Sequence, residues 1–269
     1  MNKTLTPQIE DELIEVPFTL DRNLIMIQVK IINTEDCSFI FDTGTSGIVL
    51  SESIVQSHNL ETDGYTFMAS PNSNMKEKVK NVIIPSLNFN GLNLENCKAV
   101  AVKPELIFSP GAAGIIGLPA FNFDLLTIDY QNAKLIFRKG NLEPGEGTLN
   151  IDASFILEAK ILLNDKKVSA QFDCGAPGYI AIPMEWKPEL KLKSEPVLAG
   201  KGRTPGGEFE VYRSQLDGEI KIGTIVIIDP QISLLTGGFN AVNVGFEFFK
   251  NHTITIDTKN KLMQIKPNK

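Results

Sequence analysis

The chain has 269 residues, of which 42% are hydrophobic, and a net charge of −6. This composition supplies the core of one large all-β domain or of two small ones. No basic run is longer than two lysines, which argues against nucleic acid as a partner. Its three cysteines are too few for a disulfide framework and, with only two histidines, show no zinc-binding spacing, so we expect no metal site. We assign the chain no other cofactor.

The first residues give no sign of a targeting segment. Residues 1–16 form a polar lead-in without the apolar core of a signal peptide, and no later stretch is long enough to span a membrane. We therefore expect a soluble chain. If a signal peptide has been removed, the protein would be exported, either periplasmic or secreted.

The first half of the chain reads as strands, one helix and a hairpin. Its predicted strands lie at 17–21, 24–32, 37–41, 87–94 and 98–102. A short helix is expected over 52–59, with Ser51 as its N-cap. Residues 64–69 and 79–84 are the candidate arms of a hairpin whose tip is at 70–74.

One short signature occurs twice. Residues 39–51 read FIFDTGTSGIVLS, and residues 170–183 read AQFDCGAPGYIAIP. A single Asp-Thr-Gly is an ordinary turn sequence, but here the two aspartates, Asp42 and Asp173, lie 131 positions apart, about half the chain. A repeat at half length indicates two copies of one unit. An acid on a tight turn in each copy suggests that the copies meet face to face and pair their carboxylates.

The flanking sequences match as well. The corresponding segments are 27–32 with 157–162, 114–118 with 242–246, and the closing hairpins 125–137 with 253–265. Asn164 and Asp165 supply a turn in the second copy. Asp129 and Asp257 fall at equivalent places in the closing hairpins. We expect them to end strands at the turns and assign them no catalytic role.

On these motifs the chain resembles the retropepsin-like aspartic proteases, from about residue 17 to residue 265. The residues that carry the resemblance are 41–46 with 115–117, and 172–176 with 244–245. In that family each unit gives one aspartate. The resemblance implies an all-β, pepsin-like bilobal pseudo-dimer of two fused β-barrel units, 17–138 and 151–269, joined by a linker at 139–150, with the active site between the units.

The resemblance also implies site residues. Asp42 and Asp173 would be catalytic: two close carboxylates share one proton, as is known for aspartic proteases, so one can act as an acid while the other activates water. Active-site loop support is expected from Thr43, Gly44, Thr45, Cys174, Gly175, Ala176, Gly117 and Gly245. The hairpin at 64–84 would be the flap that closes over substrate, with a simple surface hairpin as the alternative. Its counterpart in the second unit would span 199–212. The expected flap residues are Ser70, Pro71, Asn72, Gly202, Thr204 and Gly206.

The second unit departs from the family pattern. The family has Thr or Ser after each aspartate, with a hydroxyl that reaches across to the other unit. Thr43 can do this, whereas Cys174 is a poor donor. Asn243 stands where the first unit has apolar Ile116, in the segment expected to lie behind the aspartate loop. The second unit also has no counterpart of the helix, because Pro188 interrupts the equivalent segment.

Two functions follow from this pattern. The leading hypothesis is an aspartic endopeptidase that cleaves peptide or protein substrates without metal or covalent intermediate. Thr45 could hydrogen-bond Asp42, whereas Ala176 cannot do the same for Asp173, so the two acids would have unequal surroundings. The alternative is a peptide-binding or regulatory module that has lost turnover, suggested by Cys174 and Asn243. We expect a monomer, because a fused pair already satisfies the two-fold contact.

Overall fold

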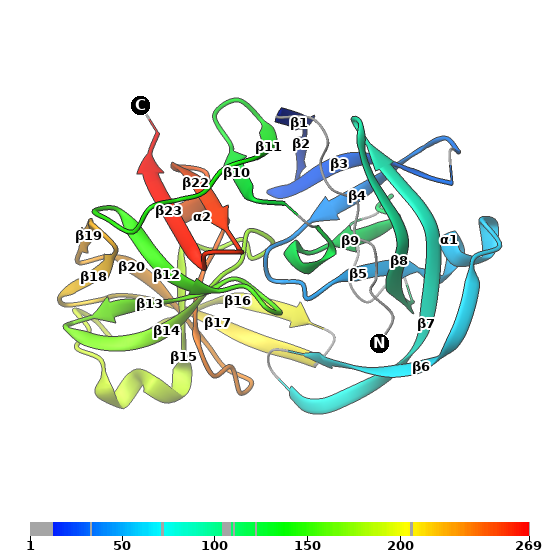
Figure 1. Ribbon diagram of the computed structural model, residues 1–269. Coiled ribbons are helices and arrows are strands. Elements are labelled where there is room, and N and C mark those ends of the chain that lie inside the picture. The colour runs from blue at the N-terminus through cyan, green and yellow to red at the C-terminus, as the bar shows by residue number, and fades with distance from the viewer. Residues whose placement is uncertain are drawn as a thin grey trace.

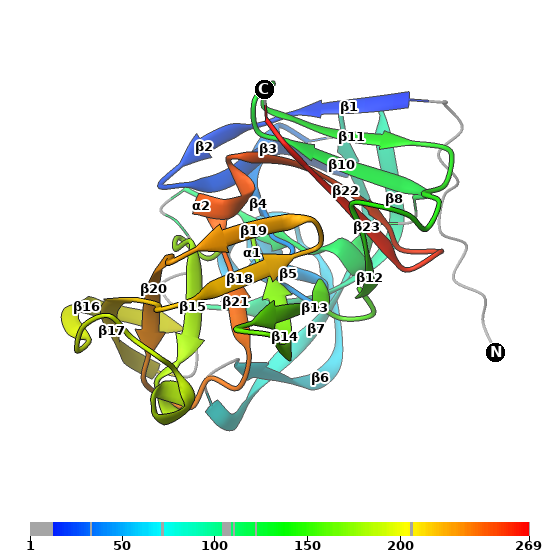
Figure 2. The ribbon, with the colours of Figure 1, turned by 90° about the vertical axis from the view of Figure 1, so that its left-hand side faces the viewer.

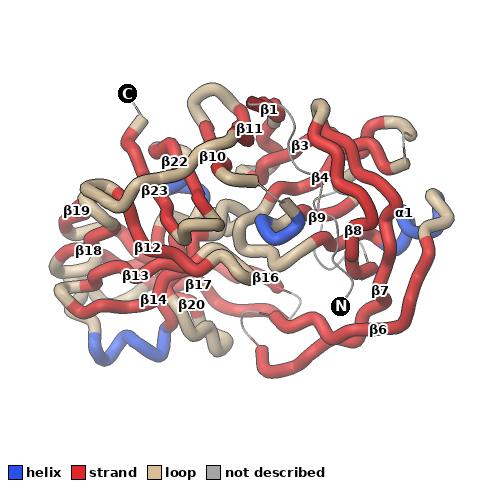
Figure 3. Tube along the Cα trace, viewed as in Figure 1, coloured by secondary structure: helices blue, strands red, loops and turns tan. Residues whose placement is uncertain are grey.

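The computed structural model describes residues 13–32, 34–70, 73–103, 109, 111–121, 123–204 and 207–268. Strands make up most of this part of the chain, and its helical segments are all short (Figure 3). Two lobes stand side by side, with a sheet of strands from both between them (Figure 1). This arrangement confirms the expected all-β, two-lobed fold.

The first lobe is an eight-stranded sheet in the order β2-β3-β4-β9-β5-β8-β7-β6. An extra pairing of β3 with β7 closes the sheet on itself. Its elements are β2 (Thr19–Asp21), β3 (Leu24–Ile31), β4 (Asp36–Phe41), β5 (Ile48–Ser51), α1 (Glu52–Ser57), β6 (Glu61–Ser70), β7 (Ser73–Phe89), β8 (Leu92–Val102) and β9 (Gly114–Ile116). Strand β9 lies between β4 and β5, parallel to the first and antiparallel to the second.

The second lobe repeats this plan. Its strands are β13 (Glu158–Leu163), β14 (Lys166–Phe172), β15 (Ile180–Pro183), β16 (Val197–Thr204), β17 (Gly207–Gln215), β18 (Glu219–Ile222), β19 (Ile225–Ile228), β20 (Gln231–Leu235) and β21 (Val242–Val244). Strand β21 lies between β14 and β15 as β9 lies between β4 and β5. In place of α1 the second lobe has a 3-10 helix, Met184–Glu189, which contains Pro188.

A sheet between the lobes joins the two halves. Its strands, in the order β1-β11-β10-β22-β23-β12, are β1 (Leu13–Pro17), β11 (Lys134–Arg138), β10 (Leu125–Asp129), β22 (His252–Asp257), β23 (Leu262–Pro267) and β12 (Thr148–Asp152) (Figure 2). At its centre β10 pairs antiparallel with β22, Thr127 opposite Thr255, and the two hydroxyl oxygens are 2.9 Å apart. Since these threonines are equivalent in the two units, the pseudo-two-fold axis passes between them.

Several predicted elements need correction. The strand expected at 17–21 is divided at Phe18, and β1 begins inside the expected polar lead-in, where it pairs with β11. The strand expected at 87–94 is wrong, because β7 runs on to Phe89 and the turn falls at Asn90 and Gly91. The strand expected at 98–102 is present as the second half of β8, which begins earlier, at Leu92. The helix predicted over 52–59 begins after the Ser51 cap as expected but ends at Ser57.

The structure also shows the predicted turn at Asn164 and Asp165, the surroundings of Asp129 and Asp257, and the state of the cysteines. The turn at Asn164 and Asp165 joins β13 to β14, and both residues have positive φ. Asp129 accepts a hydrogen bond from the Asn132 backbone, and buried Asp257 accepts one from the Leu142 backbone, so both acids hold turns and loops in place. Cys37, Cys97 and Cys174 are free thiols. Among the described residues, no helix has the length and apolar character that a membrane crossing requires.

Candidate active site

The two aspartates stand at equivalent strand ends. Strand β4 ends at Phe41, and the Asp42 amide donates to the Ile116 carbonyl at 3.0 Å. Strand β14 ends at Phe172, and the Asp173 amide donates to the Val244 carbonyl at 2.9 Å. Each acid therefore begins a turn that is held to the neighbouring strand, β9 or β21, so the rigid core of each lobe sets its position.

Glycines allow the two turns to interlock. A methyl group on Gly44 would lie 2.5 Å from Cγ of Asp173, and one on Gly175 would lie 2.8 Å from Cγ of Asp42. Neither distance is possible for a real side chain, so each glycine makes room for the carboxyl group of the opposite lobe. The structure thus brings the two predicted acids together across the lobe boundary.

A second pair of glycines lies behind the turns. A methyl group on Gly117 would be 1.8 Å from the Thr45 carbonyl oxygen, and one on Gly245 would be 2.7 Å from the Ala176 carbonyl oxygen. Both glycines directly follow the central strand of their lobe. They allow the backbone of the acidic loop to lie directly against the strand that supports it.

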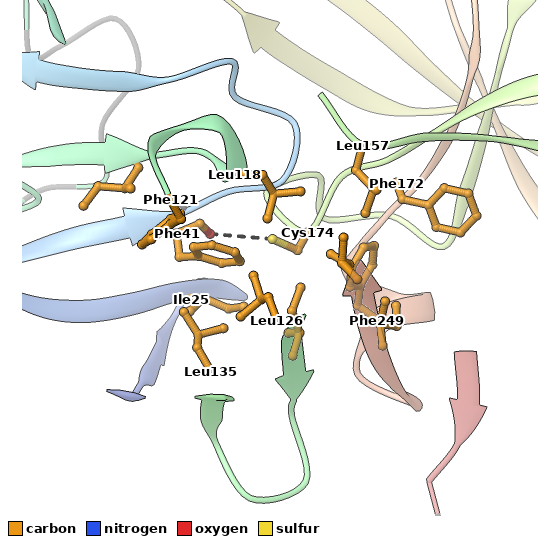
Figure 4. Close-up of a cluster of buried hydrophobic side chains, with 14 of the residues drawn as sticks. Ile25, Phe41, Leu118, Phe121, Leu126, Leu135, Leu157, Phe172, Cys174 and Phe249 are labelled. Atoms are coloured by element: carbon orange, nitrogen blue, oxygen red, sulfur yellow. Dashed lines mark hydrogen bonds between the residues drawn. The ribbon is translucent and has the colours of Figure 1, made fainter. Parts of the chain in front are cut away.

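The residues after the aspartates brace the loops across the boundary. The Thr43 hydroxyl donates to the Phe172 carbonyl at 2.6 Å and accepts from the Cys174 amide at 3.0 Å. The mirror contacts are made by the Cys174 sulfur, which accepts from the Thr43 amide at 3.4 Å and lies 3.6 Å from the Phe41 carbonyl (Figure 4). Cys174 therefore keeps its place in the brace, with the longer contacts of a thiol.

Burial decides the chemistry of Cys174. Its side chain is completely buried, and Figure 4 shows it among Phe41, Leu118, Phe172 and other apolar side chains. Burial raises the pKa of the thiol, and the nearby Asp42 charge raises it further. A neutral thiol closed off from solvent is a packing and bracing group and does not serve as a nucleophile.

Every carboxyl oxygen of the pair has a donor. For Asp42, Oδ1 accepts from the Gly44 amide at 2.8 Å and Oδ2 from the Thr45 hydroxyl at 2.6 Å. For Asp173, Oδ1 accepts from the Gly175 amide at 2.9 Å and the Ala176 amide at 3.0 Å. Its Oδ2 accepts from the Asn243 side-chain amide at 3.2 Å.

The contact of Asn243 corrects the sequence alignment. Strand β14 pairs Phe172 with Val244, and β4 pairs Phe41 with Ile116, so Asn243 is the counterpart of Ile115 and not of Ile116. Its neighbours Val242 and Val244 are buried, whereas Asn243 is half-buried on the opposite face of the strand, where it reaches Asp173. On sequence alone Asn243 favours a module without turnover, and its contact with Asp173 is not predicted.

The electrostatics favour one shared proton. Burial raises the pKa of Asp173 well above its usual range, and the charge of Asp42 and a hydrogen bond with it act in the same direction. The donors Asn243 and Gly175 oppose this shift. Two close acids of which one is neutral and one is charged are the arrangement that general acid–base chemistry needs.

A cleft of about 630 Å³ opens over the two acids. The apolar side chains of its first-lobe wall include Leu24, Ile40, Val49, Met68, Val100 and Ile115, and the polar side chains of Asn81 and Lys98 line the same wall. Residues of β6, together with Arg203 and Thr204 from the end of β16, line the same cleft. Hairpins from both lobes thus border the space over the acids, and their ends approach each other in Figure 1.

The predicted flap residues have mixed outcomes. Thr204 lines the cleft, whereas Gly202 lies against the Phe209 ring, which a methyl group would meet at 2.2 Å. Ser70 pairs with Ser73 at the end of the first hairpin. Pro71, Asn72 and Gly206 lie outside the described residues. Within the described ranges no three His, Cys, Asp or Glu side chains gather in a way that could hold a metal ion.

The fold and the paired acids define a two-lobed aspartic protease architecture. A family model described as aspartyl protease matches residues 27–120 and 157–248, one segment in each lobe and each containing one of the two aspartates. The matches cover more than half of the sequence, so the chain belongs to the aspartyl protease family. No curated protein matches the sequence.

Solved structures share this fold at low sequence identity. Basic 7S globulin from soybean is 10% identical with a TM-score of 0.56, and the match covers 95% of this chain and 95% of that one. The structure of edgp is also 10% identical, with a TM-score of 0.57 and coverage of 97% and 96%. At this identity the likeness concerns the fold alone.

Proposed function

We propose that the protein is an aspartic endopeptidase that hydrolyses peptide bonds with a water held between Asp42 and Asp173. The observation that carries the proposal is the interlocked pair of acids, in which Gly44 and Gly175 each leave room for the opposite carboxyl group. The cleft above the pair, bordered by hairpins from both lobes, supports an extended peptide as the substrate.

The two acids have different roles in this proposal. Asp173, whose pKa is raised by burial and by Asp42, holds the shared proton and donates it to the substrate carbonyl oxygen. Asp42, held by Gly44 and Thr45, takes a proton from the water while the water oxygen attacks the carbonyl carbon. The product of this step is a neutral gem-diol, and no bond to the protein forms.

The second step returns the protons. Asp42 gives its proton to the leaving nitrogen while one gem-diol hydroxyl returns a proton to Asp173, so the C–N bond breaks and an acid and an amine leave. The pair ends in its starting state. Because the two groups titrate as one unit, the pH profile of kcat/KM should be bell-shaped and should report apparent pKa values of the pair.

The alternative, a peptide-binding module without turnover, rested on Cys174 and Asn243. Both residues take part in the site, one in the brace between the loops and the other at Asp173. The proposal therefore keeps turnover. It also keeps a monomer, because one chain supplies both acids.

The test is cleavage of a diverse peptide mixture between pH 3 and 8, read by mass spectrometry, with and without a statine-type inhibitor. Asp42→Asn and Asp173→Asn should each abolish cleavage. Asp129→Asn is the matched control, because it changes the same residue type in a surface turn away from the cleft. Inhibitable cleavage that survives in Asp173→Asn would refute the mechanism. Binding of peptides without cleavage at any pH would instead favour the module without turnover.

A further inference from the structure

We propose that Asn243 is a positioning residue that does for Asp173 what the Thr45 hydroxyl does for Asp42, and so holds Asp173 in the geometry of the acid pair. This inference rests on the proposed function. In the first lobe Thr45 donates to Oδ2 of Asp42. The counterpart of Thr45, 131 positions later, is Ala176, which has no side-chain donor. Asn243, which lies on β21 and not on the acidic loop, donates to the corresponding oxygen of the second acid, Oδ2 of Asp173.

The sheet fixes where this amide points. Strand β21 is the central strand of its lobe, and the Asn243 backbone lies opposite Gln171 on one side and Ala181 on the other. Its buried neighbours Val242 and Val244 face the core, so alternation turns the Asn243 side chain to the opposite face. Strand geometry therefore positions the amide, whereas Thr45 acts from the acidic loop itself.

The equivalent residue of the first lobe shows what the position otherwise holds. Ile115 is buried and lines the first-lobe wall of the cleft. An isoleucine at position 243 would leave Oδ2 of Asp173 without the donor that it has now. The exchange of donors is thus reciprocal: the first lobe has a hydroxyl on the loop and an apolar strand residue, and the second has an apolar loop residue and an amide on the strand.

The electrostatic surroundings leave Asn243 as the side-chain donor that can act on Asp173. The titratable groups that face Asp173 are Asp42, Cys174 and Tyr130. Burial raises the pKa of Cys174 and of Tyr130, so both stay neutral in the range where the pair titrates. Neither donates to Asp173: the Cys174 thiol faces the Phe41 carbonyl, and the buried Tyr130 hydroxyl has no hydrogen-bond partner among the described residues. The cations of the cleft, Lys98 and Arg203, lie in its exposed walls. A hydrogen bond from Asn243 favours the ionised form of Asp173 and opposes the effect of burial.

The decisive variants are Asn243→Leu, which keeps the size and removes the donor, and Asn243→Leu with Ala176→Thr, which introduces a hydroxyl where the first lobe has one. Asn150→Leu on β12 is the matched control, because Asn150 is exposed and does not line the cleft. We expect Asn243→Leu to lower kcat by about tenfold to a hundredfold with little change in KM, as for the loss of one hydrogen bond to a charged group.

The pH profile separates positioning from folding. Without the Asn243 donor the ionised form is less favoured, so the bell of kcat/KM should move to higher pH, and no limb should move to lower pH. The double variant should recover both the rate and the profile. An unchanged rate and profile in Asn243→Leu would overturn the inference. A lost rate with an unmoved profile and no rescue by Ala176→Thr would also overturn it, since a structural role alone explains that result.

A readout that does not depend on activity keeps the inference separate from the proposed function. Carbon-13 NMR of the aspartate carboxyl groups, with Asp173 assigned by Asp173→Asn, measures titration in the intact protein. The carboxyl signal of Asp173 should titrate at higher pH in Asn243→Leu than in the parent, and at the parent value in the double variant. If the parent cleaves no peptide, the proposed function fails, and this titration alone decides: a shift supports the contact, and an unmoved signal overturns it.

Discussion

The brace between the lobes makes a quantitative prediction about Thr43. The Thr43 side chain is fully buried, and its hydroxyl serves two backbone groups of the other lobe, the Phe172 carbonyl and the Cys174 amide. Thr43→Val keeps the shape of the side chain and leaves both groups buried without a partner. At about 1–3 kcal/mol for each such group, the free energy of unfolding should fall by ~2–6 kcal/mol.

Thr43→Ser is the matched control, because it keeps the hydroxyl and loses one methyl group, at about 1 kcal/mol. With roughly 2 °C of melting temperature per kcal/mol for a chain of this size, we expect a loss of ~4–12 °C for Thr43→Val and ~2 °C for Thr43→Ser. Differential scanning calorimetry measures both. Equal losses in the two variants would refute the reasoning, since the hydroxyl would then contribute nothing beyond its neighbouring methyl group.

Three further predictions concern the acids and the cleft. Gly175→Ala should abolish cleavage in a folded protein, because its methyl group would lie 2.8 Å from Cγ of Asp42, whereas Gly178→Ala meets nothing within 4 Å; equal activity of the two would contradict the close approach. The pKa of Asp173 is raised in the folded state, so the stability that its protonated form contributes is present below about pH 4 and is lost as the pH rises through the folded-state pKa. Asparagine stays neutral at every pH, so Asp173→Asn should exceed the parent in melting temperature by more at pH 7 than at pH 3. An equal difference at the two pH values would contradict a raised pKa for Asp173. Arg203 lines the cleft and, in the described part of the chain, has no ion-pair partner. Arg203→Glu should therefore lower kcat/KM about tenfold for peptides with Asp or Glu beside the cleaved bond and leave neutral peptides unaffected. An equal loss for both peptide classes would argue against charge recognition.

The two-lobed plan could be predicted because the chain repeats itself. The Asp-x-Gly motifs, their apolar flanks and the closing hairpins recur at almost constant spacing, and such a pattern is local enough to be read from the sequence. The hydrogen bond from Thr45 to Asp42 follows from the same motif, because the two residues share one tight turn. Contacts within a single unit could therefore be predicted from the sequence.

Two sequence-based predictions, the strand at 87–94 and the place of Asn243, were wrong for physical reasons. Asn90 and Gly91 both have positive φ, 50° and 89°, and this residue pair is a strong hairpin signal that the strand assignment at 87–94 passed over. The role of Asn243 was missed through a shift of one residue in the alignment with the first unit. In a strand such a shift exchanges the core face for the opposite face, so the residue was expected behind the loop and is found beside Asp173.

The two units keep their likeness where the geometry couples them and differ where it does not. Gly44 and Gly175 each accommodate the acid of the opposite lobe, so a side chain at either would displace the pair, and both remain glycine. The donors to the Oδ2 atoms come from within each lobe, Thr45 in the first and Asn243 in the second, and no contact across the boundary requires them to match. Thr45 donates from the loop that carries Asp42, and Asn243 donates over a longer distance from the sheet. This difference in donors makes the two acids unequal before any substrate binds, and an unequal pair is one in which a particular carboxyl group holds the shared proton.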